Sequence, residues 1–347
     1  MFGKVEIPGK FGFGSMSLTW TDTPKPLADA IETVKFVTEH DQFDVKFING
    51  GEFYGPDDAN LKLLKAFVDT NTAEQNRELI ISIKGGLVEN YEPDGSKENI
   101  AKSIENIIRY FPDDKLKRPK LLFEISRVDR KVPYDKTIGY INEYVKAGKI
   151  DGISLTEVGV SSIQKAISVA PISCVEVEFS LLCQDILENG VLEELAKHNI
   201  DIVAYSPLSR GYLTDYTVEH ADTWLSDIPE GDMRKHSGKF QPEAYKNNII
   251  LVKNLYKFAH EKKNTSLESL SLSWIIAVSG RKSFKGINNI PKILPIPSGS
   301  TKEKLTKSLG SIIELTDNDL NEIDQICKET PVQGLRYDEN HELFLFA

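Results

Sequence analysis

Cysteine is scarce in this chain, and its three cysteines are not placed for a disulfide framework or a zinc site. Cys174, Cys183 and Cys327 make an odd number and form no Cys-x-x-Cys pair or close Cys/His spacing. We therefore predict no bound metal. Free cysteine is most often buried, so we interpret these thiols as packing groups.

Long apolar runs and an excess of positive charge are also missing. No run approaches the roughly 20 residues that cross a bilayer, and the first residues lack a secretion signal. With 42 Lys and Arg against 52 Asp and Glu, the net charge is −10, which disfavours a broad nucleic-acid or anionic-membrane surface. We predict a monomer or weak oligomer of the cytoplasm, with the nucleus also open, whose partner is a small molecule.

A Gly-x-Gly-x-x-Gly motif after the first apolar run is absent as well, which disfavours a Rossmann dinucleotide site. Short apolar runs instead alternate with amphipathic segments along the chain, as in repeated strand–helix units. Predicted strands are residues 11–16, 45–49, 79–84, 121–125, 152–155, 174–178, 201–205 and 293–296, and predicted helices between them are 27–39, 60–68, 98–109, 134–147, 161–169, 191–198 and 267–277. The pattern predicts an α/β protein, a (β/α)8 TIM barrel forming one domain over residues 1–347.

Four segments lie outside this repeat. Residues 2–10 suggest a hairpin that plugs the barrel floor, and residues 331–347 form a tail that we place over the site. The polar stretch 214–239 is either a large loop over the site or disordered. Residues 279–291 are predicted to be a surface loop.

Tyr54 and Lys84 each follow an apolar run, so a barrel brings the phenol close to the ammonium group. A cation about 4 Å away at an effective dielectric near 20 lowers a phenol pKa by about 3 units, and burial opposes part of this shift. We predict that Tyr54 is a proton donor tuned by Lys84. Gly50–Gly51 and Gly85–Gly86 leave room beside it. The alternative is an ordinary half-buried tyrosine next to a lysine.

Two further loops have the composition of a nucleotide site. After the seventh strand, Tyr205 suits stacking on a flat ring, and a diphosphate could lie along the segment made of Ser206, Pro207, Leu208, Ser209, Arg210 and Gly211. After the eighth, a small-residue loop opens a helix whose amides and hydroxyls could hold a ribose 2′-phosphate, with the residues Ser298, Gly299, Ser300, Thr301 and Lys304. The alternatives are a strand that ends at Pro207 and a Thr301 that only caps a helix.

Taken together, these strings resemble the aldo-keto reductases over nearly the whole chain. Glu52–Gly55 is similar to the family's catalytic Tyr motif, Lys84–Gly86 to its catalytic Lys, and residues 12–20 to its first strand. The resemblance implies NADPH as cofactor and hydride transfer with Tyr54 as general acid. It also implies further cofactor contacts from Gly14, Ser15, Met16 and Ser308, and carboxamide contacts from Thr156, Glu157 and Glu176.

The family tetrad of Asp, Tyr, Lys and His is incomplete here. Asn49 stands where the Asp would fall and Ser126 where the His would fall, and none of the six histidines replaces it in the motif. Without the carboxylate, we expect the field of Lys84 to lower the Tyr54 pKa further, with Asn49 holding Lys84. Ser126, or a water that it holds, is either a weak substitute for the His or a space filler.

Within the family, residues 49–55, 127–133 and 334–337 are similar to those of the yeast pyridoxal reductases. This implies reduction of pyridoxal to pyridoxine, with the substrate contacted by Trp20, Arg127, Arg336 and Tyr337. Two alternatives remain. One is a broad aldehyde or ketone reductase of methylglyoxal and aromatic aldehydes, and the other is an NADPH-binding sensor or auxiliary subunit with little turnover.

Overall fold

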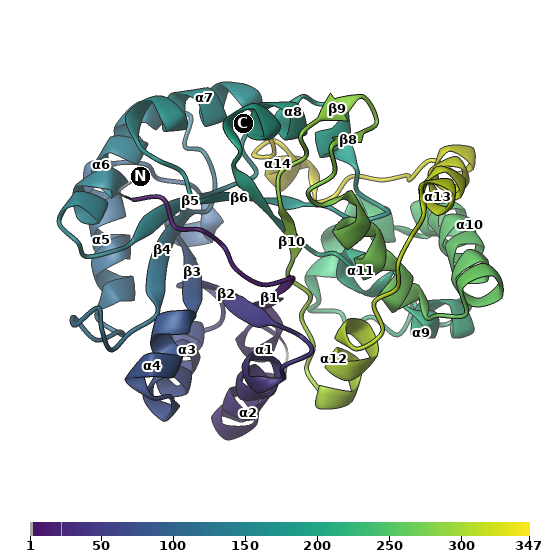
Figure 1. Ribbon diagram of the computed structural model, residues 1–347, viewed down its shortest axis with the longest axis horizontal. Coiled ribbons are helices and arrows are strands. Elements are labelled where there is room, and N and C mark those ends of the chain that lie inside the picture. The colour runs from purple at the N-terminus through teal and green to yellow at the C-terminus, as the bar shows by residue number, and fades with distance from the viewer. Residues whose placement is uncertain (1–2, 22) are drawn as a thin grey trace.

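A ring of eight parallel strands forms the centre of the protein, whose computed structural model describes residues 3–21 and 23–347. The order in the sheet follows the chain (Figure 1). The strands are β1 (Phe11–Gly14), β2 (Val45–Gly51), β3 (Ile80–Gly85), β4 (Lys120–Ile125), β5 (Gly152–Thr156), β6 (Cys174–Glu178), β7 (Asp201–Tyr205) and β10 (Ile293–Pro295). The predicted TIM barrel is confirmed.

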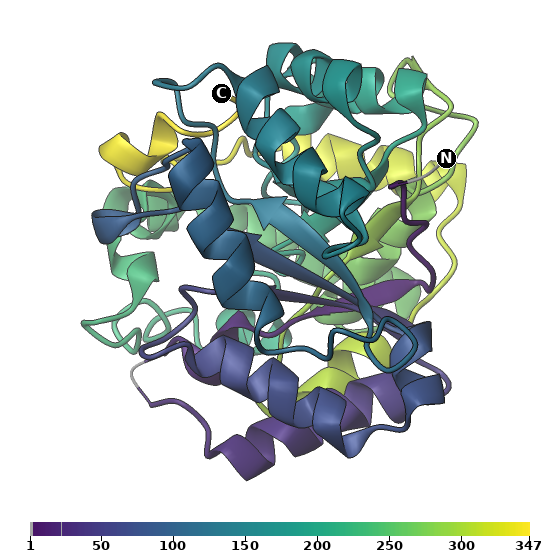
Figure 2. The same cartoon turned by 90° about the vertical axis from the view of Figure 1, so that its left-hand side faces the viewer.

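Helices cover the outside of this ring (Figure 2). The predicted helices occur as α2 (Leu27–Glu39), α3 (Ala59–Thr70), α5 (Lys97–Ile108), α6 (Tyr134–Lys146), α7 (Val160–Val169), α8 (Val191–His198) and α11 (Leu267–Val278). The short helix α4 (Ala73–Glu78) was not predicted. It begins with a capping box, in which Thr72 and Gln75 bond each other's backbone amides.

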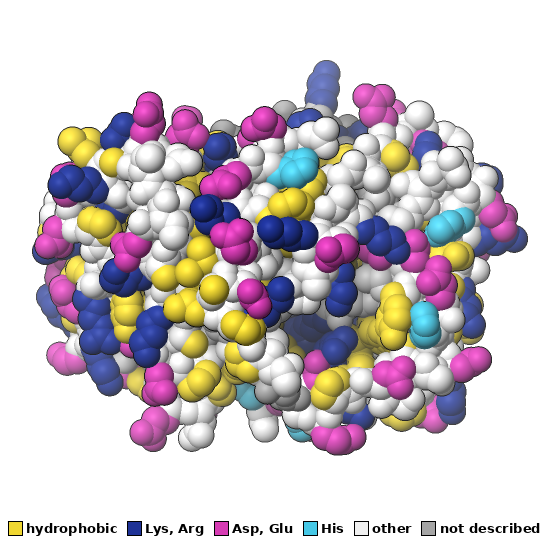
Figure 3. Space-filling view, turned by 90° about the horizontal axis from the view of Figure 1, so that it is seen from below, with side chains coloured by type: hydrophobic (Ala, Val, Ile, Leu, Met, Phe, Trp, Pro, Cys, Tyr) yellow, Lys and Arg dark blue, Asp and Glu magenta, His cyan; other side chains and the backbone are white. Residues whose placement is uncertain are grey.

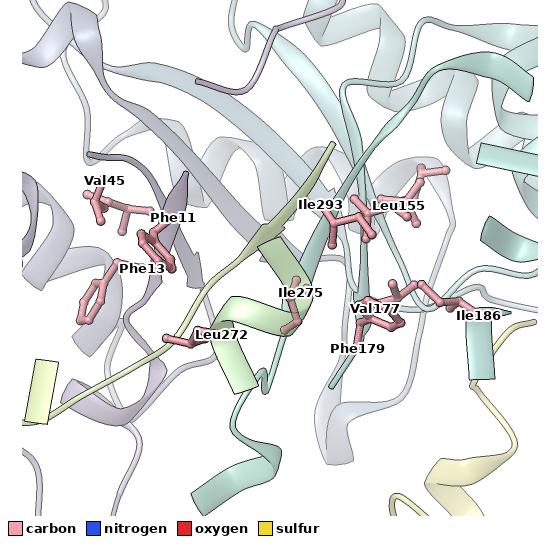
Figure 4. Close-up of a cluster of buried hydrophobic side chains, with 14 of the residues drawn as sticks. Phe11, Phe13, Val45, Leu155, Val177, Phe179, Ile186, Leu272, Ile275 and Ile293 are labelled. Atoms are coloured by element: carbon pink, nitrogen blue, oxygen red, sulfur yellow. The ribbon is translucent and has the colours of Figure 1, made fainter. Parts of the chain in front are cut away.

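Two apolar layers hold the barrel together. The larger lies between the strands and the helices, where residues such as Phe179, Leu272 and Ile275 interdigitate (Figure 4). The smaller fills the barrel floor with alternate, inward-facing strand residues that include Phe47, Ile80, Leu122, Cys174, Val203 and Leu294. Side chains two positions further along the strands therefore also face the barrel axis, and all of these except Ile296 carry polar groups.

Val5 and Ile7 close the floor from below, although the predicted hairpin is wrong for the residues that are described. Residues 3–10 contain no strand, and Phe2 lies outside the described residues. Pro8 lacks an amide hydrogen and Gly9 has a φ of 79°, so a regular pairing is interrupted. The segment instead bonds to the barrel, through Val5 N to Ser173 Oγ at 3.0 Å and Lys292 Nζ to Ile7 O at 2.6 Å.

The ring closes at a thin seam between β1 and β10. Within the described ranges, one backbone hydrogen bond joins the two sides, from Gly14 N to Pro297 O at 3.3 Å. Ile296 packs so close that a Cβ on Gly12 would lie 2.7 Å from its Cγ2. The first strand ends at Gly14 rather than at Met16 as predicted, because Ser15 N bonds to Asn49 O and the helix α1 (Met16–Thr19) begins.

The chain after β7 is an ordered loop with short helical turns, which agrees with the predicted loop rather than with the alternative of disorder. It contains α9 (Asp215–Glu219) and the 3-10 turns η3 (Ser209–Gly211), η4 (Met233–His236) and η5 (Gly238–Phe240). Trp224 is buried and its ring packs against those of Tyr212 and Tyr245. This aromatic packing could not be read from the polar composition of the stretch.

The remaining elements complete the outer layer. They are α10 (Pro242–Lys257) with a π-helical end, η6 (Phe258–Lys262), the small hairpin of β8 (Ser283–Phe284) and β9 (Ile287–Asn288) in place of the expected surface loop, α12 (Lys302–Leu309), α13 (Asp317–Glu329) and α14 (Glu339–Glu342). The two short 3-10 turns η1 (Glu89–Tyr91) and η2 (Asp185–Leu187) follow β3 and β6.

No helix in residues 3–21 and 23–347 is long and apolar enough to cross a bilayer. In the same ranges, no group of three or more His, Cys, Asp or Glu side chains is arranged to hold a metal ion. On the face shown in Figure 3, acidic and basic side chains are interspersed around a hollow with basic groups recessed in it.

Candidate active site

Tyr54 and Lys84 lie together at the carboxyl ends of neighbouring strands. Lys84 is the fifth residue of β3, and Tyr54 follows β2, which pairs with β3. The Lys84 Nζ lies 5.8 Å from the centre of the Tyr54 ring, and both side chains are buried. The predicted juxtaposition of phenol and ammonium is therefore present.

Glycines fix the position of the Tyr54 ring. A Cβ on Gly51 would lie 2.9 Å from the ring atoms of Tyr54, so the absent side chain makes room for the tyrosine itself. Gly55 has a φ of 95°, and a Cβ there would lie 2.5 Å from Thr19 O. Thr19 Oγ1 in turn donates a hydrogen bond of 2.9 Å to Tyr54 O. The turn is thus built around the phenol.

Two glutamates, rather than one aspartate, neutralise Lys84. The Lys84 Nζ lies 2.6 Å from Glu176 Oε1 on β6 and 3.0 Å from Glu124 Oε1 on β4. It also donates to Asn49 Oδ1 at 2.8 Å, as predicted for Asn49. Glu124 was not predicted, although a charged residue inside an apolar strand is itself unusual and could have pointed to it.

The amide of Asn49 bridges the two carboxyl groups. Its Nδ2 donates to Glu124 Oε2 at 2.8 Å and to Glu176 Oε2 at 2.6 Å. Glu124 also accepts from Ser82 Oγ at 2.7 Å and from Thr156 Oγ1 at 2.6 Å. Glu124 therefore accepts three hydrogen bonds beside its ion pair with Lys84, and Glu176 accepts two, all of them from residues that line the barrel axis.

The electrostatic effect on Tyr54 is opposite to our expectation. Burial, together with the nearby Glu176 and Glu124, outweighs the lowering effect of Lys84 and raises the Tyr54 pKa to about 12. The prediction of a lowered pKa was wrong because burial, aided by the two carboxyl groups, outweighs the effect of the ammonium charge. Tyr54 is hence fully protonated near neutral pH, as a proton donor must be before it reacts.

The other two charged groups are shifted as well. Although burial acts to lower it, the pKa of Lys84 is raised by Glu124 and Glu176. Burial and the neighbouring Glu124 raise the Glu176 pKa to about 8, despite the opposing effect of Lys84.

The remaining predicted contacts near Tyr54 are occupied by the protein itself. Ser126 Oγ donates to Gly85 O at 2.8 Å, so its hydrogen is directed to the backbone. Thr156 Oγ1 donates a hydrogen bond to Glu124, and Glu176 accepts one from Lys84. Glu157 accepts a hydrogen bond of 2.9 Å from Glu178 N. These three are the residues that the resemblance assigned to the nicotinamide carboxamide.

An aromatic wall stands beside Tyr54. The Trp20 ring centre lies 5.5 Å from that of Tyr54 and 5.3 Å from that of Tyr91. Phe53 completes the group, 5.1 Å from Tyr54. Asn90 and Tyr91 have φ values of 61° and 60°, a strained pair that leaves the Tyr91 ring partly exposed.

The C-terminal tail reaches the barrel mouth through Arg336. This buried guanidinium pairs with Glu157, lies 3.0 Å from Glu178 Oε2 through its Nε, and donates to Tyr205 Oη at 2.8 Å. The predicted position of the tail over the site is present. Arg336 is engaged by the ends of β5, β6 and β7, and Glu178 was not predicted.

Tyr337 lies between two other arginines. Its ring centre is 4.4 Å from the Arg210 guanidinium and 5.8 Å from that of Arg127, and its hydroxyl is 3.0 Å from the Tyr205 hydroxyl. Arg210 also donates to Arg336 O at 3.1 Å. The structure thus brings Arg127, Arg210 and the two tail residues together around Tyr205.

The two predicted nucleotide loops lie at the ends of β7 and β10. Ser206 and Arg210 have φ values of 47° and 56°, which turn the loop of residues 206–211 sharply. Thr301 caps α12 by accepting from Lys304 N at 3.2 Å, while the Lys304 side chain is exposed and Ser308 is buried. Ser15 Oγ donates to Asn49 O at 2.8 Å, so Ser15 joins the ends of β1 and β2.

Comparison with known proteins agrees with this geometry. Residues 10–328 match the model described as the aldo/keto reductase family. The chain belongs to the aldo/keto reductase family. The predicted class of enzyme, an oxidoreductase that acts on aldehydes, is thereby confirmed, and NADP(H) is the cofactor of the family.

Individual relatives extend over most of this aldo/keto reductase. A probable pyridoxal reductase 2 from Schizosaccharomyces pombe is 30% identical over 339 residues, which cover 96% of each chain. A putative pyridoxal reductase from Saccharomyces cerevisiae is 33% identical over 348 residues, covering 94% of this chain and 95% of its own. These relatives agree with the predicted resemblance to the yeast pyridoxal reductases.

Two further matches concern the cofactor and the fold. A Schizosaccharomyces pombe protein named aldo-keto reductase yakc [NADP(+)] is 33% identical over 219 residues, or 62% of this chain and 59% of its own. The solved glycerol dehydrogenase from Gluconobacter oxydans superimposes with a TM-score of 0.76 at 18% identity and covers 96% of both chains. That similarity supports the barrel alone.

Proposed function

We propose that this aldo/keto reductase reduces pyridoxal to pyridoxine with NADPH, and that Tyr54 is the general acid. The observation that carries the proposal is the buried contact between Tyr54 and Lys84 at the barrel mouth. In reduction, Tyr54 gives its proton to the oxygen of the aldehyde as that oxygen gains charge. The positive charge of Lys84 then stabilises the phenolate that remains.

The residues at the ends of β7 and β10 form a site that fits a dinucleotide. The hydroxyl of Tyr205 is held by Arg336 and Tyr337, so its ring is fixed as a flat platform at the end of β7. Gly299 lies where a Cβ would approach the Leu305 side chain to 2.8 Å, which keeps the loop before α12 compact. Bound NADPH would supply the hydride.

Selectivity for NADPH over NADH requires a cation that is free to bind the ribose 2′-phosphate, and few are available near α12. Lys307 is already paired with Asp215 at 3.0 Å and Glu268 at 3.2 Å. Lys304, which is exposed next to the Thr301 cap, is therefore the cation that we assign to the ribose 2′-phosphate, with Ser300 and Thr301 as hydroxyl donors. The loop of residues 206–211 would hold the diphosphate.

An aromatic aldehyde suits the wall of Trp20, Phe53 and Tyr91. These rings offer flat surfaces within 6.1 Å of one another next to Tyr54, and offset stacking on a heteroaromatic substrate contributes about 0.5–1.5 kcal/mol. The two full-length relatives named as pyridoxal reductases support pyridoxal among such aldehydes.

Replacing Tyr54 by phenylalanine tests the proposal. We expect Tyr54→Phe to lower kcat for pyridoxal at least a hundredfold, because general acid catalysis contributes about 10²–10⁴-fold, while NADPH affinity measured by fluorescence quenching stays within about threefold. Tyr134→Phe is the matched control, since Tyr134 is equally buried at the start of α6 and its hydroxyl has no partner in the described structure. Its kcat should match the wild type.

The outcomes separate the alternatives. Turnover of pyridoxal retained in Tyr54→Phe would contradict the role of Tyr54. Equal kcat/KM for pyridoxal, methylglyoxal and nitrobenzaldehyde in the wild type would favour a broad reductase. Tight NADPH binding without turnover of any of these carbonyls would favour a cofactor sensor.

A further inference from the structure

The two carboxyl groups beside Lys84 carry more negative charge than one ammonium can balance. Glu124 on β4 and Glu176 on β6 both accept a hydrogen bond from the amide nitrogen of Asn49. Lys84 contacts both, at 3.0 Å and 2.6 Å. All four side chains are buried, so no water layer screens the two carboxyl groups from each other.

Two buried carboxyl groups that contact the same amide and the same ammonium group favour a state in which only one of them is ionised near neutral pH. Two carboxyl groups that share a site titrate as a pair, and one proton is retained by the pair until the pH rises well above the ordinary value. The donors are unequal, because Glu124 accepts three hydrogen bonds and also pairs with Lys84, whereas Glu176 accepts two. Glu176, which accepts fewer hydrogen bonds, is therefore the better site for the proton.

We propose that Glu124 and Glu176 act as one unit that holds a single shared proton in the working enzyme, and that loss of this proton to solvent at alkaline pH weakens Tyr54 as an acid. The proposal rests on the proposed role of Tyr54. It makes the two glutamates positioning residues, which act on the reaction through Lys84 and Tyr54.

The charge balance gives the direction of the effect. With the proton in place, Lys84 and the pair sum to zero, so a phenolate at Tyr54 meets no net negative charge. After the proton leaves, the cluster is net negative, and a second negative charge beside it is unfavourable in a buried site. Both glutamates already raise the pKa of Tyr54. Reduction by Tyr54 must then slow.

Few other groups could produce this pH dependence. The titratable side chains that face the pair, in the part of the chain the structure describes, are Lys84 on β3, Tyr54 after β2 and Cys174 on β6. Burial raises the Cys174 pKa well above its ordinary value, and Lys84 is shifted upward too. Neither titrates before the carboxyl pair.

The pH profile of kcat tests the proposal. For the wild type at saturating NADPH and pyridoxal, kcat should fall roughly tenfold or more between pH 7 and 9.5. In Glu124→Gln and in Glu176→Gln, a single carboxylate remains to balance Lys84, so each variant should lose this decline and stay within about threefold over the same range. A solely structural role would change kcat but leave the decline in place.

A buried glutamate elsewhere serves as the control. Glu194 on α8 is 5% exposed and pairs with Lys197 and His198, far in sequence from the barrel axis residues. Glu194→Gln should keep the wild-type decline. The same decline in both Glu124→Gln and Glu176→Gln would overturn the proposal.

Infrared spectroscopy provides a readout that needs no turnover. A band of a protonated buried carboxyl group should be present in the wild type at pH 7, vanish by pH 10, and be missing from both glutamine variants. Its absence in the wild type at pH 7 would overturn the shared proton even if Tyr54 proves to be the acid. Its presence in a protein without turnover would instead mean that the proposed function alone has failed.

Discussion

The Nε of Arg336 lies 3.0 Å from Oε2 of Glu178, and this ion pair fastens the C-terminal tail to the end of β6. The residues are 158 positions apart, and each side chain is only 3% exposed. Glu157 on the adjacent strand end contacts the same guanidinium. Because buried charges are costly unless they are paired, each of these groups depends on the other two.

Removal of Arg336 should destabilise the protein strongly. Arg336→Leu leaves Glu157 and Glu178 buried with less compensation, and we expect a loss of about 3–5 kcal/mol in the free energy of unfolding by urea. Arg281→Leu is the control, because Arg281 pairs with the exposed Asp317 and such surface pairs contribute about 0–1 kcal/mol. Equal losses in the two variants would contradict a special role of the buried pair.

Acid should weaken this contact in a defined range. Burial acts to raise the pKa of Glu178, but Arg336, Lys239 and Arg210 lower it from 4.5 to about 2. A depressed pKa stabilises the folded state fully above pH 4.5, and this stabilisation is lost as the pH falls towards 2. The difference in unfolding free energy between wild type and Glu178→Gln should shrink by about 3 kcal/mol over this range.

A surface glutamate provides the comparison for the acid titration. Glu39 is 53% exposed and lies 3.9 Å from Lys35. For Glu39→Gln the difference from the wild type should hardly change with pH. A Glu178→Gln curve that runs parallel to the wild type from pH 5 to pH 2 would show that the cations do not stabilise the ionised Glu178.

Tyr91 should affect aromatic substrates selectively. Tyr91→Ala removes one ring of the wall beside Trp20, so KM for pyridoxal should rise about two- to tenfold, from a stacking energy of about 0.5–1.5 kcal/mol. KM for methylglyoxal, which has no ring, should stay the same. Tyr256→Ala is the control, because Tyr256 lies on the outer helix α10 with its ring centre 4.0 Å from that of His260. An equal rise for both substrates would argue against stacking at Tyr91.

The C-terminal tail crosses close over the η5 turn, and this close approach depends on Gly334 in the tail and Gly238 in the turn. Gly334 has a φ of 87°, and a Cβ there would lie 2.3 Å from the carbonyl carbon of Gly238. Gly334→Ala should cost about 1–3 kcal/mol through this clash and the backbone strain, and should speed hydrogen exchange in residues 331–347.

Gly280→Ala is the control that separates the steric clash expected in Gly334→Ala from the backbone strain. Gly280 has a φ of 69° and no neighbouring atom within 4 Å of a Cβ, so this variant carries the strain alone. Its cost should be smaller, and exchange in the tail should be unchanged. Tail exchange that is unaffected in Gly334→Ala would mean that the crossing does not hold the tail.

Much of this barrel could be predicted from the sequence because its signals are local. Apolar runs marked each strand, and their order fixed which strand ends would meet, so Tyr54 and Lys84 could be placed together before the structure was known. The same reasoning located Tyr205, and the resemblance to the family identified Asn49 and the tail residues Arg336 and Tyr337.

The electrostatics of the site could not be predicted in this way. The Tyr54 pKa depends on Glu124, which comes from β4 and is 70 residues away from Tyr54 in the sequence. Glu178 and Arg336 meet only after the tail has folded back. Such contacts depend on register and burial, which an alternating pattern does not specify. The choice between a loop and disorder for residues 214–239 stayed open because it depends on the packing of Trp224 against Tyr212 and Tyr245.

The seam between β1 and β10 also bears on how the chain folds. The bond from Gly14 N to Pro297 O connects positions 283 residues apart, and only this backbone bond crosses the seam in the described parts of the chain. Closing so long a loop costs conformational entropy, and few hydrogen bonds form at the seam to offset this cost. Consecutive strands, in contrast, form a full ladder of backbone hydrogen bonds each time one is added. Synthesis on the ribosome should therefore first yield an open, seven-stranded sheet with two unpaired edges, which the last strand covers once it is released. Delayed release of residues 293–297 would leave these edges exposed for longer and so promote aggregation.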